Sequence, residues 1–235
     1  MMFMPGRRSL AVVVVALIAL IAPTTAVTAD QIVIYGAESG SHLTLSTSGG
    51  KLEVDGIMAK QAPQGCRYTQ GRHHAVCDLA DAGRVELQMG NSGDFVQVAS
   101  PLPVPLTAHL GGGSDKFIGN AENDTCYSEG ARRNRCSGGA GDDICWTGEQ
   151  NSDCVGDAGN DYCHHGAGSD GCWGGPGDDI CVMGPGQDGC HGEEGDDRLY
   201  GGAGADQLYG GPGTNYCDGL PGWGKSHECQ AGPGR

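Results

Sequence analysis

A unit of nine residues recurs along most of the second half of this chain. Its clearest copy is Gly138–Trp146, which reads Gly-Gly-Ala-Gly-Asp-Asp-Ile-Cys-Trp and fits G-G-x-G-x-D-x-U-x, where U is a large apolar residue and here is cysteine. Copies follow in phase over residues 110–218, as twelve units plus one inserted residue, Ser128. The 44 glycines in 235 residues would alone suggest a disordered chain. The strict period overrules that reading and predicts an ordered repeat structure.

Each position of the unit has a physical reason. Glycines allow the left-handed or crowded backbone of a tight turn, which points its carbonyl groups at one place. The aspartate adds a hard anionic oxygen, the kind of ligand that calcium takes six to eight times. The last residues of a unit, such as Asp143–Trp146, form a short strand whose U side chain points inward. Because one unit cannot bury that side chain alone, the units must stack.

The repeat resembles the RTX, or hemolysin-type, calcium-binding nonapeptide repeat. The resemblance rests on the in-phase units of residues 110–218, of which Gly138–Trp146 and Gly174–Val182 are typical. It implies an all-β fold, a right-handed parallel β-roll (β-solenoid), in which each unit is half a turn and units two apart share a sheet. It also implies that each calcium ion lies between two stacked turns and takes carboxylate and carbonyl oxygens from both.

This alternation sorts the aspartates onto two edges of the roll. The first edge carries Asp124, Asp143, Asp161, Asp179 and Asp197, followed by Asn215; the second carries Asp115, Asn134, Ser152, Asp170, Asp188 and Asp206. The predicted calcium ligands are carboxylates of both edges and carbonyls of the turn glycines, namely Asp124, Asp143, Asp161, Asp179, Asp197, Asp170, Asp188, Asp206, Gly138, Gly141, Gly156, Gly159, Gly174 and Gly177. The acids at position five of their units, Asp142, Asp178 and Asp196, are expected to face solvent.

Cysteine at position U is a departure from the family, where U is aliphatic. Eight successive units carry it, at Cys126, Cys136, Cys145, Cys154, Cys163, Cys172, Cys181 and Cys190. If units two apart share a sheet, neighbouring cysteines of one column have Cα atoms about 4.8 Å apart, within the range of a disulfide. The predicted bonds are Cys126–Cys145, Cys163–Cys181, Cys136–Cys154 and Cys172–Cys190, with Cys66–Cys77 and Cys217–Cys229 outside the columns. The alternatives are buried free thiols and pairing across the roll between successive units. The nine-residue spacing disfavours zinc.

The flanking segments indicate an exported protein. Residues 1–29 combine Arg7 and Arg8 with the apolar run Leu10–Ala22 and the small-residue site Val27–Ala29, as in a signal peptide. An uncleaved membrane anchor is the alternative. After cleavage no membrane span is expected, and an even total of twelve cysteines suits an oxidising compartment.

Residues 30–109 form a β-rich leader in this scheme, and residues 219–235 form an irregular cap. Alternating apolar and polar residues predict leader strands at Gln31–Tyr35, His42–Ser46, Lys51–Val54, Arg84–Met89 and Phe95–Ala99. The segment Gly90–Val96 looks like a decayed unit, with Asp94 at the aspartate position and Val96 at U.

The charge and the absence of catalytic motifs narrow the function. The formal net charge is −15, and −17 without residues 1–29, which argues against nucleic acid and anionic lipid as partners. The sequence contains no H-E-x-x-H and no G-x-S-x-G. It therefore predicts a secreted, non-enzymatic protein that binds several Ca2+ ions, with an unknown protein or glycan partner. A surface adhesin or spacer, and a secreted enzyme with its active site in residues 30–109, remain alternatives.

Overall fold

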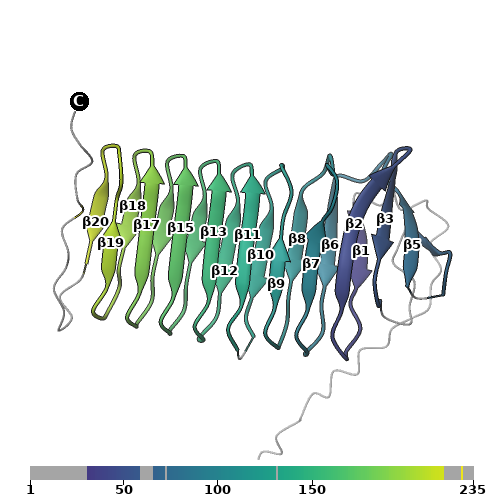
Figure 1. Cartoon of the computed structure of the whole chain (residues 1–235), viewed down its shortest axis with the longest axis horizontal. Coiled ribbons are helices and arrows are strands. Elements are labelled where there is room, and N and C mark those ends of the chain that lie inside the picture. The colour runs from purple at the N-terminus through teal and green to yellow at the C-terminus, as the bar shows by residue number, and fades with distance from the viewer. Residues whose placement is uncertain (1–30, 59–65, 72, 131, 220–228, 230–235) are drawn as a thin grey trace, which may run out of the picture.

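The computed structural model describes residues 31–58, 66–71, 73–130, 132–219 and 229. In these residues the chain is all β: two sheets face each other along a parallel β-solenoid, with short turns at both edges (Figure 1). No helix in the described residues is long and apolar enough to cross a membrane. The predicted signal peptide and most of the predicted cap lie outside the described residues.

The first sheet is parallel throughout. Its nine strands, in spatial order, are β1 (Gln31–Tyr35), β6 (Arg84–Gln88), β8 (Leu106–His109), β10 (Thr125–Ser128), β12 (Ile144–Thr147), β14 (Tyr162–His164), β16 (Ile180–Val182), β18 (Arg198–Tyr200) and β20 (Tyr216–Asp218). From β8 onward, consecutive strands of this sheet come from units two apart. The predicted half-turn arrangement is therefore confirmed.

The second sheet has eleven strands. They follow the order β19 (Gln207–Tyr209), β17 (Gly189–Glu194), β15 (Gly171–Pro176), β13 (Asp153–Ala158), β11 (Arg135–Ala140), β9 (Lys116–Ile118), β7 (Phe95–Val98), β2 (His42–Ser48), β3 (Lys51–Asp55), β5 (His74–Asp78) and β4 (Cys66–Tyr68). The pairs are parallel from β19 to β2 and antiparallel from β2 to β4.

Both sheets run across the sequence boundary at residue 110. Strands β1, β2, β6 and β7 of the leader add to the same sheets as the nonapeptide strands, and all five strands predicted there are present. The decayed unit is part of the roll, since Val96 is in register with Phe117 and is fully buried. The sequence did not predict β4, β5 and β8.

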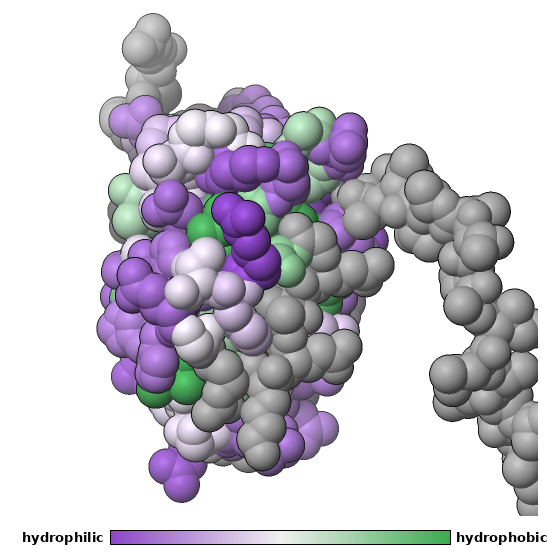
Figure 2. Space-filling model, turned by 90° about the vertical axis from the view of Figure 1, so that its right-hand side faces the viewer, coloured by the Kyte–Doolittle hydropathy of each residue, from purple (hydrophilic) through white to green (hydrophobic). Residues whose placement is uncertain are grey.

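At the N-terminal end of the second sheet, the strands pair antiparallel instead of parallel. The turn from β2 to β3 uses Gly49 and Gly50 with φ of 56° and 75°, as a two-residue hairpin requires. Viewed from this end, the visible described surface is mostly hydrophilic, with small hydrophobic areas (Figure 2). These strands thus give the stack a hairpin end in place of another parallel strand.

The core is a double column of U side chains. One column has Cys126, Cys145, Cys163, Cys181 and Leu199 in register; the other has Phe117, Cys136, Cys154, Cys172, Cys190 and Leu208. All of these side chains are buried. Sulfur therefore replaces the aliphatic carbon of an ordinary roll core over four turns.

The disulfides cross the roll, and the predicted pairing within columns is wrong in this structure. The bonds in the roll are Cys126–Cys136, Cys145–Cys154 and Cys181–Cys190, with Cα atoms 6.2, 6.1 and 6.7 Å apart. Cys163 and Cys172 are buried free thiols, so the predicted bonds Cys163–Cys181 and Cys172–Cys190 are absent too. The structure does join Cys66 to Cys77 and Cys217 to Cys229.

The reason is the direction of the side chains. In-register neighbours in a parallel sheet point the same way, so their Cβ atoms stay about 4.8 Å apart, farther than the 3.8 Å of a typical disulfide. Cysteines in the facing sheets point at each other. Two small side chains let the sheets approach to about 6 Å, well inside the usual 10 Å between packed sheets.

Peptide mapping under non-reducing conditions should therefore find links between successive units. We expect peptides that join Cys126 to Cys136 and Cys145 to Cys154, because only facing side chains have converging Cβ atoms. Digestion followed by mass spectrometry makes the measurement, and the Cys66–Cys77 peptide is the internal control. A dominant Cys126–Cys145 peptide would contradict the geometry of the roll.

Candidate metal site

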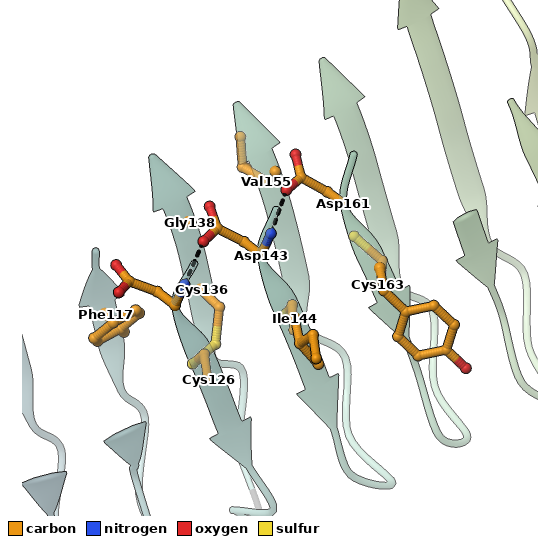
Figure 3. Close-up of a pocket in the computed structure, with 13 residues that line it drawn as sticks. Phe117, Cys126, Cys136, Gly138, Asp143, Ile144, Val155, Asp161 and Cys163 are labelled. Atoms are coloured by element: carbon orange, nitrogen blue, oxygen red, sulfur yellow. Dashed lines mark hydrogen bonds between the residues drawn. A yellow bond between two sulfur atoms is a disulfide. The ribbon is translucent and has the colours of Figure 1, made fainter. Parts of the chain in front are cut away.

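The aspartates of the first edge form a continuous ladder. Oδ1 of Asp124 accepts a hydrogen bond from the N–H of Leu106. Each later aspartate accepts one at Oδ1 from the N–H of the aspartate one turn earlier, at 2.6 Å from Asp124 to Asp143 and 2.8 Å from Asp143 to Asp161 (Figure 3). The series continues through Asp179 and Asp197 to Asn215. The predicted first-edge residues therefore lie together, one per turn, and all five aspartates are buried.

The other carboxylate oxygen has no partner. Oδ2 of Asp143, Asp161, Asp179 and Asp197 is buried without a hydrogen bond among the described residues. A buried carboxylate oxygen without a partner is costly, and a cation is the ligand that its charge requires. A hard oxygen set of this kind fits calcium.

Glycine makes the room for that oxygen. A Cβ added at Gly138 would lie 2.0 Å from Oδ2 of Asp143, and one at Gly156 would lie 2.1 Å from Oδ2 of Asp161. The same relation holds between Gly174 and Asp179. The first glycine of each of these first-edge units thus leaves a space for the carboxylate, which we call its cradle. Any side chain at this position would fill that space.

The glycine at position four of the unit allows the turns to stack closely. Gly141, Gly159 and Gly177 have φ of 110°, 142° and 152°, which L side chains rarely adopt. A Cβ at Gly159 or Gly177 would lie 2.0 Å or 1.8 Å from the carbonyl oxygen of the glycine one turn earlier. Glycine at these positions therefore leaves room for the carbonyl oxygen of the turn before it.

Burial raises the pKa of these carboxyls. Desolvation is the main cause, and it raises the pKa of Asp143 to about 8 and that of Asp179 to about 7, with neighbouring carboxylates adding to the effect. Burial likewise raises the pKa of Asp161 to about 6. A bound cation would favour the ionised form of each group, so protons and a cation compete for this edge.

The second edge carries a longer ladder than the sequence predicts. Here too, the N–H of Asp170 donates to Oδ1 of Asp188, and the N–H of Asp188 donates to Oδ1 of Asp206. Oδ1 of Asp115 likewise accepts from the N–H of Asp94 at 2.8 Å. Asp94 in turn accepts from the N–H of Ser41. Asp94 and Asp115 are buried with an unpartnered Oδ2, yet neither was among the predicted ligands. The signal for Asp94 was the decayed unit Gly90–Val96, whereas Asp115 was already placed on the second edge by the repeat.

The first residue of a unit lies beside the ladder, at a place that we call the corner. On the first edge this residue is glycine and the corner is open, whereas on most of the second edge a side chain fills it. The first position of the unit is Gly138, Gly156, Gly174 and Gly192 on the first edge. On the second edge it is Thr147, His165 and Met183, with glycine again at Gly201, and the inserted Ser128 lies in register with Thr147. The side chains of Ser128, Thr147, His165 and Met183 are at most 3% exposed. His165 Nδ1 bonds Thr147 Oγ1 at 2.8 Å and lies 3.9 Å from Oδ1 of Asp170. The two edges therefore offer different environments to a metal ion.

The acids at position five form an outer row. Oδ1 of Asp142 accepts from the N–H of Asn160, and Oδ1 of Asp178 accepts from the N–H of Asp196, each at 2.8 Å. Asp142, Asp178 and Asp196 are exposed, as predicted. They support the turns from outside and lie away from the buried ladder.

Comparison with known proteins agrees with this geometry. Four copies of the RTX calcium-binding nonapeptide repeat match the chain, at residues 107–131, 136–153, 155–172 and 191–222. No significant match is found among curated proteins or among solved structures. The matched segments include Asp124, Asp143 and Asp161 of the first edge, and these four segments of the chain are therefore RTX calcium-binding nonapeptide repeats.

Proposed function

We propose that this protein is a secreted, non-enzymatic calcium binder whose ions sit mainly on the first edge of the roll. The observation that carries the proposal is the row of buried, unpartnered Oδ2 atoms, each in a cradle that glycine leaves open. The family match supports calcium as the ion. Export through a signal peptide, and the disulfides as covalent supports of the roll, are parts of the same proposal.

The first edge offers four gaps, and the first differs from the others because Oδ2 of Asp124 accepts a hydrogen bond from the N–H of Asn120. Five successive aspartates, from Asp124 to Asp197, enclose four spaces between stacked turns. The second edge keeps the carboxylates Asp170, Asp188 and Asp206, but His165 and Met183 occupy its corner. We therefore assign the stronger sites to the first edge and the weaker sites to the second.

An Asp161→Asn substitution should remove the tight binding of two calcium ions. Asp161 stands between two gaps of the first edge, and asparagine keeps the shape while it loses the charge. We expect the affinity of these two sites to fall by about tenfold or more, because ligand charge sets calcium affinity. Calorimetric titration of the chelator-treated protein gives both the stoichiometry and the affinities.

Asp142→Asn is the matched control. It makes the same chemical change nineteen residues before Asp161, on an exposed side chain of the outer row. It should leave the number of tight sites unchanged. Equal losses in the two variants would mean that the buried ladder is not the binding site.

The stability of the calcium-free protein should fall as the pH rises. The folded pKa values of Asp143 and Asp179, about 8 and 7, are above the ordinary value of 3.8. Their contribution is therefore fully present below about pH 4 and is lost as the pH rises through 7 and 8. We expect the melting temperature in chelator to fall between pH 5 and pH 8. With saturating calcium this fall should disappear, because the ion requires the ionised form. Parallel pH profiles with and without calcium would contradict the competition.

A further inference from the structure

A groove crosses the outer face of the second sheet and borders the turns of the first edge, since Gly174 and Gly175 line it. It has a volume of about 500 Å³, and its lining includes Arg135, Val155, Asp157, Trp173 and Glu193. These residues belong to four successive strands of the sheet, β11, β13, β15 and β17. At about 4.8 Å per strand the groove extends about 14 Å along the roll, longer than one six-membered ring.

One wall of the groove is the ring of Trp173. Trp173, His191 and Tyr209 form a row of rings on β15, β17 and β19, with interplanar angles of 3° and 16°. The row ends at Trp173, because the next strand, β13, has Val155 in register with it. Trp173 is half-buried and lines the groove together with Val155. The last ring of the row is therefore the apolar surface that the groove offers to a ligand.

Two strained acids stand on either side of Trp173 along the roll. Asp157 and Glu193 have φ of 73° and 76°, and they are the only residues other than glycine with positive φ in the described part of the chain. The equivalent position between them is Gly175, with φ of 115°. Glycine would fit all three positions without strain. Strained backbone at a groove, kept for two exposed carboxylates, is typical of a ligand site.

The polar groups of the groove select a neutral ligand with many hydroxyl groups. Asp157 and Glu193 accept hydrogen bonds, whereas the guanidinium of Arg135 only donates them. A hydroxyl group can do both. A cationic ligand would meet Arg135, and an anionic ligand would meet two carboxylates within a chain of net charge −15. We propose that this groove binds a neutral saccharide of linked pyranose rings, with the C–H face of one ring on Trp173. This goes beyond the calcium function proposed above.

The test is a calorimetric binding titration of the full, calcium-loaded protein, a readout that does not depend on Trp173. The probes are neutral hexaoses of β-1,4-linked glucose, β-1,4-linked xylose, β-1,4-linked N-acetylglucosamine and α-1,4-linked glucose, with trilysine and trigalacturonate as charged comparisons. We expect at least one neutral hexaose to bind, and Trp173→Ala to weaken that binding by about tenfold or more. Trp146→Ala is the matched control, since Trp146 stacks on His164 in the other sheet.

Asp157→Gly separates a binding role from a structural one. Glycine relieves the positive φ but loses the hydrogen bond that Ser137 Oγ donates to Asp157 Oδ2, so this variant should stay folded and yet bind the hexaose less tightly. Three results would each overturn the proposal: no neutral hexaose binds, Trp173→Ala and Trp146→Ala bind alike, or Asp157→Gly keeps the parent affinity. Binding of trilysine or trigalacturonate alone would overturn it as well.

Discussion

The reduced protein should lose its compact shape when calcium is removed and regain it when calcium returns. Residues 156–218 carry twelve acidic residues and one arginine, a net charge of −11. Without cations these carboxylates repel one another, and those of the ladder are buried in addition. Each ion that binds only the folded form adds about 2.7 kcal/mol at a hundredfold excess over its Kd. Four such ions match the whole stability of a typical domain, about 5–15 kcal/mol.

The measurement is the radius of gyration of the reduced protein by small-angle X-ray scattering. In chelator the chain should expand toward the roughly 50 Å expected for an unfolded chain of this length. High monovalent salt should reverse the expansion only in part, because it screens charge without coordinating the carboxylates. A radius that does not respond to calcium after reduction would contradict the coupling of binding to folding.

The oxidised protein should also respond to chelator, but less. Each disulfide of the roll joins two cysteines nine or ten residues apart, on facing strands of the same turn. It therefore forms no link between successive turns. The chain-entropy estimate for the loop that it closes is about 2.7 kcal/mol. Between turns, the contacts are the backbone bonds of the sheets, the aspartate ladders and the ions proposed there. The disulfides therefore connect the two sheets within a turn, whereas the proposed calcium ions connect one turn to the next.

The repeat period was enough to predict the fold. Once units two apart share a sheet, the register of Cys126 with Cys145 and the grouping of Asp124 with Asp143 follow from counting. The disulfide pairing could not be predicted in the same way. Counting gives Cα spacing within a sheet, whereas pairing depends on side-chain direction and on how closely two sheets pack, which sequence spacing does not contain.

The sequence contains the difference between the two edges, but only the structure explains what that difference does. His165 and Met183 stand where the pattern has its first glycine. Only the geometry shows that this glycine faces a carboxylate oxygen, so that a side chain there changes the site. The groove at Trp173 was beyond sequence reasoning, since it joins residues of four strands and two strained backbone positions.

Gly156→Ala should damage both calcium binding and folding. The new Cβ would lie 2.1 Å from Oδ2 of Asp161 and 2.5 Å from the carbonyl oxygen of Gly174, where no atom fits. Either the carboxylate turns away from the gap or the turns separate. Overpacking of this kind costs about 1–3 kcal/mol, and the displaced carboxylate should weaken the adjacent calcium sites.

Gly189→Ala is the matched control for this cradle. Gly189 also lies in the roll, at the start of β17, but a Cβ there would have no neighbour within 4 Å. Its stability should stay within about 0.5 kcal/mol of the parent. Thermal melting with and without calcium, together with calorimetric titration, measures both variants. If Gly156→Ala and Gly189→Ala both bind calcium as the parent does, the ion is not held by the carboxylate that Gly156 accommodates. Of the two variants, only Gly156→Ala should lose calcium affinity, because only its added methyl group lies against a carboxylate oxygen that is proposed as a ligand.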